Sequence, residues 1–242
     1  MVPKVAKANG RHLLAEMLRG EPEFLRTWIE DWDARRLILC IGMIVIGAGL
    51  YGAAMGYWRD PRQALFVAIK FPLVILLTTI GNSLLNAMLA PLLGLNIGLR
   101  QSFLAILMSF TIASAVLGSF SPLTAFLVWN APPLSAASTI PRETYSAIQL
   151  THVSIIAFAG IVANLRLVQL LGQLAASGTI ARRVLVAWLS GNLFFGSQLS
   201  WILRPFIGSP ALPVEFFRQA AFQGNFYESV FRSAWSLLHT AK

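Results

Sequence analysis

Amide side chains and one histidine are the residues best suited to do chemistry inside the apolar stretches of this sequence. They recur at helical spacing within three stretches, so that at about 100° per residue each group shares one helix face. Amides buried in hydrocarbon need hydrogen-bond partners. We therefore expect the three faces to point at one another, either as hydrogen-bonding contacts between helices or as the lining of a small polar path. The residues concerned are Asn82, Asn86, Gln149, His152, Asn164 and Asn192.

Carboxylates are missing from the same region, which argues against catalysis and coupled transport. No Asp or Glu occurs between Arg62 and Arg142, or between Thr144 and Val214. General acid–base catalysis, Ser–His–Asp chemistry and proton relays all use such acids. His152 has no Cys, Asp or Glu at metal-ligand spacing. We therefore expect no catalytic residues, no metal and no cofactor.

The overall composition predicts an all-α integral membrane protein. Hydrophobic residues make up 56% of the 242 positions and charged residues 12%, whereas soluble domains carry about 25% charged residues. The formal net charge is +9, but Lys and Arg are scattered between apolar runs. Nucleic-acid binding needs these residues clustered on a polar surface. The lipid bilayer is thus the expected environment, and nucleic acid is not an expected partner.

Five apolar runs are long enough to cross the roughly 30 Å hydrocarbon core of a bilayer. In the second run, Pro72 is predicted to begin the helix, with residues 64–71 in the interface and Lys70 reaching the headgroups. In the third run, Pro122 allows one long kinked helix or two short segments. We favour the kinked helix because each half alone is too short to cross. The expected spans are about 37–57, 72–93, 103–129, 144–171 and 183–203.

The distribution of basic residues predicts the orientation of the bundle. Cytoplasmic segments of membrane proteins carry an excess of Lys and Arg. Arg35 and Arg36 directly precede the first span, and more basic residues fall on that side than on the other. We expect a cytoplasmic N-terminus and an extracytoplasmic tail, residues 204–242, in a bacterial inner membrane. Two short segments in place of the third span would instead put the C-terminus inside.

The polar N-terminal region, residues 1–36, is predicted to contain a cytoplasmic amphipathic helix. Glu21 and Pro22 can begin this helix, and Phe24, Trp28 and Trp32 then recur on its apolar face. Two interpretations remain open. The helix either lies along the membrane surface, packed under the bundle, or it docks a cytoplasmic partner.

A stripe of small residues in the first span predicts a close contact between helices. Ala48, Gly52 and Gly56 are spaced four residues apart, so they share one helix face. Small residues at this spacing let two backbones approach each other closely in a membrane. We expect a neighbouring helix to pack against this stripe.

The tail after the fifth span is too aromatic to lie free in water. We expect its rings to pack against the ends of the spans, the outer leaflet of the membrane or a partner. A short helix is expected over residues 227–239, with its apolar side formed in part by aromatic residues. The candidate partner-binding residues of the tail are Arg204, Phe206, Phe226, Tyr227 and Trp235.

The tail also carries a family resemblance. Residues 198–201, 203–210 and 224–228 resemble a pattern in uncharacterised bacterial multi-span membrane proteins. Lys70-Phe71-Pro72 and the arrangement of about five spans are similar to the Yip1-like membrane group. The resemblance extends over roughly residues 64–232. It implies an all-helical integral membrane protein, and it implies no catalytic residues.

Three classes of function are compatible with these features. The leading hypothesis is a non-enzymatic membrane subunit or scaffold that binds partner membrane proteins or further copies of itself. The amphipathic N-terminal region, the small-residue stripe and the aromatic tail favour it. The alternative is a small channel or uncoupled facilitator with an amide-lined path. A membrane-embedded enzyme is the least favoured, because the spans lack carboxylates.

Overall fold

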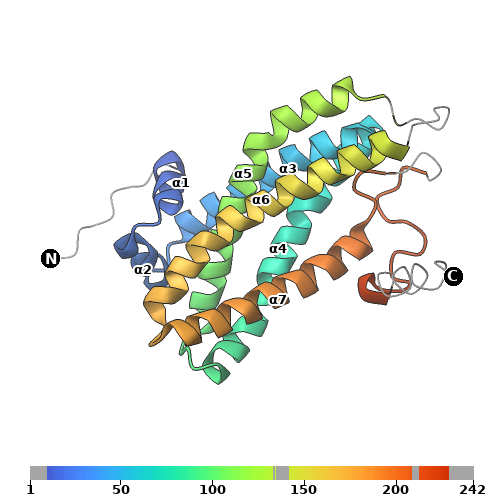
Figure 1. Cartoon of the computed structure of the whole chain (residues 1–242). Helices are drawn as coiled ribbons and strands as arrows, with labels where there is room; N and C mark the ends of the chain where they lie inside the picture. Colours follow the sequence, from blue (N-terminus) through green and yellow to red (C-terminus); the bar gives the residue numbers. More distant parts are fainter. Residues whose placement is uncertain (1–9, 133, 135–141, 209–212, 229–242) are drawn as a thin grey trace.

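The structure is a computed structural model that describes residues 10–132, 134, 142–208 and 213–228. The regular elements in these residues are all helices (Figure 1). The helices are α1 (Gly10–Arg19), α2 (Pro22–Glu30), α3 (Ala34–Tyr57), α4 (Pro61–Leu92), α5 (Leu99–Asn130), α6 (Arg142–Leu174) and α7 (Gly178–Leu203).

Within the described residues, four helices are long and apolar enough to cross a membrane. They are α3, α4, α5 and the Thr144–Leu174 part of α6. The all-α class that composition predicts is therefore confirmed, and the four apolar helices fit an integral membrane protein. The fifth predicted span falls within α7, which is not among the four. Its length is sufficient, but polar residues such as Asn192 and Gln198 interrupt its apolar sequence.

Successive long helices alternate in direction, so the bundle has two ends (Figure 1). We call one of them the N-terminal end, because α1, α2 and the beginning of α3 lie there. Arg100, in the first turn of α5, donates to the carbonyl of Glu30 and places α5's start at the same end. We call the opposite one the tail end. There Gln63, at the start of α4, contacts Pro205 and Phe206 after α7.

The second membrane helix begins earlier than predicted. α4 starts at Pro61 and continues through Pro72, so the predicted helix start at Pro72 is wrong. Asp60 caps the helix by accepting a hydrogen bond from the backbone N–H of Arg62 at 2.7 Å. Pro61 occupies the first turn, where its missing N–H is not needed. The helix therefore begins at the Asp60-Pro61 pair and not at Pro72. A proline such as Pro72 is tolerated inside a membrane helix.

The third membrane helix is continuous. α5 runs from Leu99 to Asn130 with Pro122 inside it, so residues 103–129 form one helix and not two short segments. In Figure 1 this helix changes direction along its length. Ser121 donates a side-chain hydrogen bond to the carbonyl of Gly118 at 2.7 Å. Such a bond helps to satisfy backbone carbonyls near the proline.

The small residues of α3 lie where neighbouring backbones come closest. A Cβ on Gly52 would lie 2.6 Å from the carbonyl oxygen of Val67 in α4, and a Cβ on Gly56 would lie 2.6 Å from that of Gln63. On another side of α3, a Cβ on Gly118 of α5 would lie 2.9 Å from the Cα of Gly47. Glycines therefore let α3 pack against both α4 and α5.

The N-terminal helices pack against the chain's own bundle. α2 contacts α5 and α6, and α1 contacts α5. Trp28 is 1% exposed, and its indole N–H donates to the carbonyl of Leu104 at 2.9 Å. Phe24 lies on the same side, with its ring 6.1 Å from that of Trp28. Trp32 lies beyond the end of α2 and is 52% exposed, so its predicted place on the apolar helix face is wrong.

Candidate functional site

Two of the three predicted polar faces meet, between α4 and α7. The amide nitrogen of Asn82 donates to the carbonyl of Trp188 at 3.2 Å and also to the side-chain oxygen of Asn192. Asn82 packs over Gly191, which has no side chain to obstruct it. Asn86 lies one turn further along α4 and is fully buried, with no hydrogen-bond partner for its amide among the described residues.

The polar residues of α6 do not join this contact. His152 is buried, and its Nδ1 lies 2.9 Å from the hydroxyl of Tyr51 in α3. Asn164 donates to the carbonyl of Gly160 in its own helix at 2.8 Å, and Gln149 is exposed. The prediction that all three faces point at one another is therefore wrong for α6. Residues that share a helix face can still contact different neighbours, so the six residues are not gathered at one contact.

The tail end of the bundle holds a buried cation. Lys70 is 0% exposed, so the prediction that its side chain reaches the headgroups is wrong. Its ammonium nitrogen lies 3.4 Å from the carbonyl oxygen of Pro205 and 5.1 Å from the centre of the Phe216 ring. The tail folds back over this part of α4 and covers the side chain. A charged group inside a membrane bundle is a candidate functional residue.

Backbone carbonyls of the tail are anchored to the bundle beside Lys70. Gln63 donates to the carbonyls of Pro205 at 2.8 Å and Phe206 at 3.1 Å. Tyr145 of α6 donates its hydroxyl to the carbonyl of Gly208 at 3.2 Å. Phe206 packs edge-on against Phe71, with ring centres 6.1 Å apart. Residues 204–208 are thus held across the start of α4 and α6.

A second group of cations surrounds Trp201, close to the end of α7. The guanidinium groups of Arg204 and Arg218 both lie over its indole ring. A cavity of about 300 Å³ adjoins them, and we call it the tail site. It is lined by Arg204, Pro205, Pro213, Glu215, Arg218, Gln219 and Ala220.

Two N–H donors, one in the lining of the tail site and one beside it, have no hydrogen-bond partner among the described residues. They are the Nε of Arg218 and the indole nitrogen of Trp201, and both atoms are buried. Buried donors without partners are costly, and guanidinium groups bind carboxylates and other oxyanions through paired hydrogen bonds. The chemistry of the tail site therefore fits a negatively charged group. Glu215 is the carboxylate that the chain itself places in the lining.

Exposed aromatic rings accompany these arginines in the tail. Phe217 is 51% exposed, Phe222 is 80% exposed and Tyr227 is 39% exposed. The hydroxyl of Tyr227 accepts a hydrogen bond from Ser197 at 2.9 Å, and the backbone N–H of Phe226 donates to Gln198 at 3.4 Å. The tail is thus fixed on α7 while several of its rings stay open to the surroundings.

The structure describes only the beginning of the helix that is predicted over residues 227–239. Residues 226–228 are helical, and the rest of the predicted helix, including Trp235, lies outside the described residues. Across the described residues, no three His, Cys, Asp or Glu side chains are grouped as metal ligands.

Comparison with protein-family models, curated proteins and solved structures finds no match to this chain. The resemblance to the Yip1-like group therefore rests on the motif residues and the expected arrangement of spans. Within those motifs, Trp201 and Arg204 contact each other, and Lys70 contacts Pro205.

Several residues at the tail end of the bundle were not predicted to be functional from the sequence. Gln63 and Tyr51 lie far from their partners along the chain, and no spacing rule connects them. Lys70 did carry a signal, since it interrupts an otherwise apolar run. Its burial could not be predicted, because it depends on the return path of the tail.

The buried charge of Lys70 is expected to destabilise the bundle. Its ammonium group has three N–H donors, yet the described contacts are one long hydrogen bond and one aromatic ring. Lys70→Met keeps the length of the side chain and removes the charge, so we expect it to stabilise the protein by on the order of 1 kcal/mol or more. Thermal unfolding followed by tryptophan fluorescence measures the change.

Lys70→Ala provides the comparison, because it removes the charge and also leaves a cavity. We expect it to be less stable than Lys70→Met. Equal destabilisation by both substitutions would show that the ammonium group makes a net favourable contribution.

Proposed function

We propose that this chain is a non-enzymatic membrane subunit that binds a partner membrane protein through its tail end. The observation that carries the proposal is the combination, in one segment, of two arginines at the tail site with exposed Phe217, Phe222 and Tyr227. Aromatic residues and arginine are the residue types enriched in the energetically dominant parts of protein interfaces.

The charge of the tail site supports a partner that presents a carboxylate. Arg204 and Arg218 line the cavity together with the single carboxylate of Glu215. An acidic side chain of the partner could pair with Arg204 and Arg218 where they line this cavity. A charged group of this kind positions the partner, while the neighbouring aromatic rings supply the apolar contact area.

The arrangement of α7 supports a fifth crossing of the membrane. α7 has 26 residues, which at about 1.5 Å per residue is long enough to cross. It packs along α4, one of the four apolar helices, through contacts such as Asn82 with Trp188. Its polar residues are partly paired by this packing. Five crossings put the two ends of the bundle on opposite sides of the membrane. The excess of Lys and Arg at the N-terminal end supports a cytoplasmic position for that end and an outer position for the tail end, in a bacterial inner membrane.

A photo-crosslinking amino acid at position 222 tests the proposal in intact membranes. We expect a single protein adduct, formed with the partner or with a second copy of the chain. Arg218→Gln should abolish this adduct without lowering the thermal stability of the purified chain. When the wild-type chain is purified in a gentle detergent, the protein found in the adduct should co-purify with it in a fixed ratio.

The same crosslinking group at position 150 serves as the control. Leu150 is 66% exposed on α6 and lies outside the tail. We expect lipid adducts there, because an exposed apolar residue of a membrane helix faces acyl chains. If position 222 also yields lipid adducts alone, the exposed rings belong to the aromatic belt of the membrane interface and the proposal is wrong. A protein adduct that persists in Arg218→Gln would contradict the role of the tail site.

A further inference from the structure

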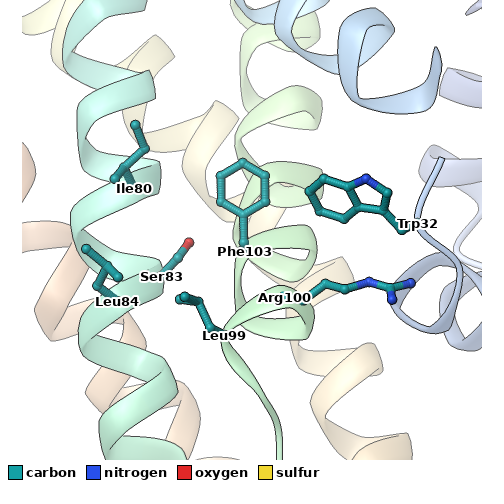
Figure 2. A pocket seen from close by; sticks show the side chains of 7 residues that line it. All are labelled: Trp32, Ile80, Ser83, Leu84, Leu99, Arg100 and Phe103. Carbon is teal, nitrogen blue, oxygen red and sulfur yellow. The ribbon is translucent and has the colours of Figure 1, made fainter. Parts of the chain in front are cut away.

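A large apolar groove lies at the opposite end of the bundle from the tail site. It has a volume of about 570 Å³, within the roughly 300–1,000 Å³ range of sites for small apolar ligands. Figure 2 shows Ile80 and Leu84 of α4 on one side, and Phe103, Arg100 and Trp32 on the other. Ser83 and Leu99 complete the lining.

The walls of the groove are suited to a hydrocarbon chain. Ile80, Leu84 and Leu99 are each about half exposed, at 51%, 50% and 50%. The hydroxyl of Ser83 donates to the carbonyl of Thr79 in its own helix at 2.5 Å, so its proton is not directed to a ligand. Both helices that form the walls are long and apolar enough to cross a membrane. We therefore expect the groove to open toward the acyl chains of the bilayer.

Arg100 provides a cation at one edge of this apolar surface. Its Nη2 donates to the carbonyl of Glu30 at 2.5 Å, and its guanidinium carbon lies 5.7 Å from the centre of the Trp32 ring. These two contacts hold the side chain in place. A guanidinium group has five N–H donors, so it can bind an anion as well. Tryptophan and arginine together at the end of a membrane helix are typical of the headgroup region.

We propose that the groove between α4 and α5 binds one anionic phospholipid. An acyl chain lies along Ile80, Leu84 and Phe103, and the phosphate group pairs with Arg100. Charge complementarity selects this occupant, because the groove combines an apolar wall with a positive charge and has no carboxylate in its lining. A partner helix would fill the apolar wall without needing the cation. Anionic lipids are attracted to basic groups at the membrane surface.

Native mass spectrometry of the purified full chain tests this proposal. The chain is titrated with phosphatidylglycerol and, separately, with phosphatidylcholine that has the same acyl chains. We expect one phosphatidylglycerol to be retained per chain, with preference over phosphatidylcholine. Arg100→Gln should weaken phosphatidylglycerol binding roughly tenfold or more, because a charge-assisted hydrogen bond is lost. Binding of phosphatidylcholine should change little in this variant.

Two further variants separate the groove from general electrostatic attraction. Arg183→Gln removes an exposed basic residue at the same end of the bundle, outside the groove, and should leave lipid binding unchanged. Leu84→Trp fills the groove and should reduce binding of both lipids, while the thermal stability of the chain is retained.

Three results would overturn the proposal. The wild-type chain could bind both lipids equally, or Arg100→Gln could behave like Arg183→Gln. Leu84→Trp could also dissociate a dimer without changing lipid retention, which would assign the groove to a second copy of the chain.

Discussion

Gly52→Ala is expected to force α3 and α4 apart. The new Cβ would lie 2.6 Å from the carbonyl oxygen of Val67 and 3.1 Å from the Cβ of Phe71. A backbone carbonyl cannot turn aside as a flexible side chain can, so the helices must shift as units. Overpacking of this kind costs roughly 1–3 kcal/mol. We expect a clear drop in the thermal unfolding midpoint of the protein in lipid nanodiscs, and a larger drop for Gly52→Leu.

Gly42→Ala is the matched control for this substitution. Gly42 lies in the same helix, and a Cβ built on it would meet no described atom within 4 Å beyond its chain neighbours and the nearby backbone of its own helix. The same added methyl group should therefore leave stability unchanged or raise it slightly, since alanine favours the helix more than glycine does. Equal midpoints for the two variants would mean that α3 and α4 do not approach each other as closely as the structure shows.

Trp28→Ala is expected to release the N-terminal helices from the bundle. The side chain is 1% exposed and donates a hydrogen bond to the carbonyl of Leu104. Truncation of a buried tryptophan costs roughly 3–5 kcal/mol, which is large compared with the docking of two short helices. We expect faster hydrogen exchange of the backbone amides of α1 and α2, while the amides of α3 to α7 stay protected.

Two comparisons define what the tryptophan contributes. Trp28→Phe keeps most of the apolar contact and loses the hydrogen bond, so its effect should be intermediate. Trp129→Ala removes an indole that is 79% exposed, and it should leave exchange in α1 and α2 unaltered. If Trp28→Ala unfolds α3 to α7 as well, the N-terminal helices are an integral part of the bundle and not a separately docked layer.

The bounds of the long helices could be predicted closely from the sequence. The start of α4 is the exception, because two start signals compete there. Long uncharged runs identify membrane helices because each residue contributes its own transfer free energy, whatever its neighbours are. Pro72 and the Asp60-Pro61 pair are both start signals, and the sequence does not rank them. Asp60 gains a hydrogen bond from the backbone N–H of Arg62 in the folded helix, and that contact places the start at Pro61.

The candidate sites were predictable in their residue types but not in their partners. Asn82 and Asn192 contact each other, whereas His152 contacts Tyr51. Yet Asn82, Asn192 and His152 all come from predicted polar faces of the same kind. The rotation of each helix about its axis decides which neighbour a polar face contacts, and helical periodicity alone does not specify that rotation. The groove near Arg100 likewise needs Trp32, which belongs to a segment far from it in sequence.

The sequence by itself determined that this protein is a helical membrane protein, which segments form its long helices, and that its spans lack carboxylates. These properties follow from composition along the chain. Only the tertiary structure decided that the tail returns over Lys70, that Arg204 and Arg218 gather around Trp201, and that α4 and α5 leave an apolar groove. Such contacts join residues distant in sequence, and they depend on how whole helices pack, which no local pattern of residues encodes.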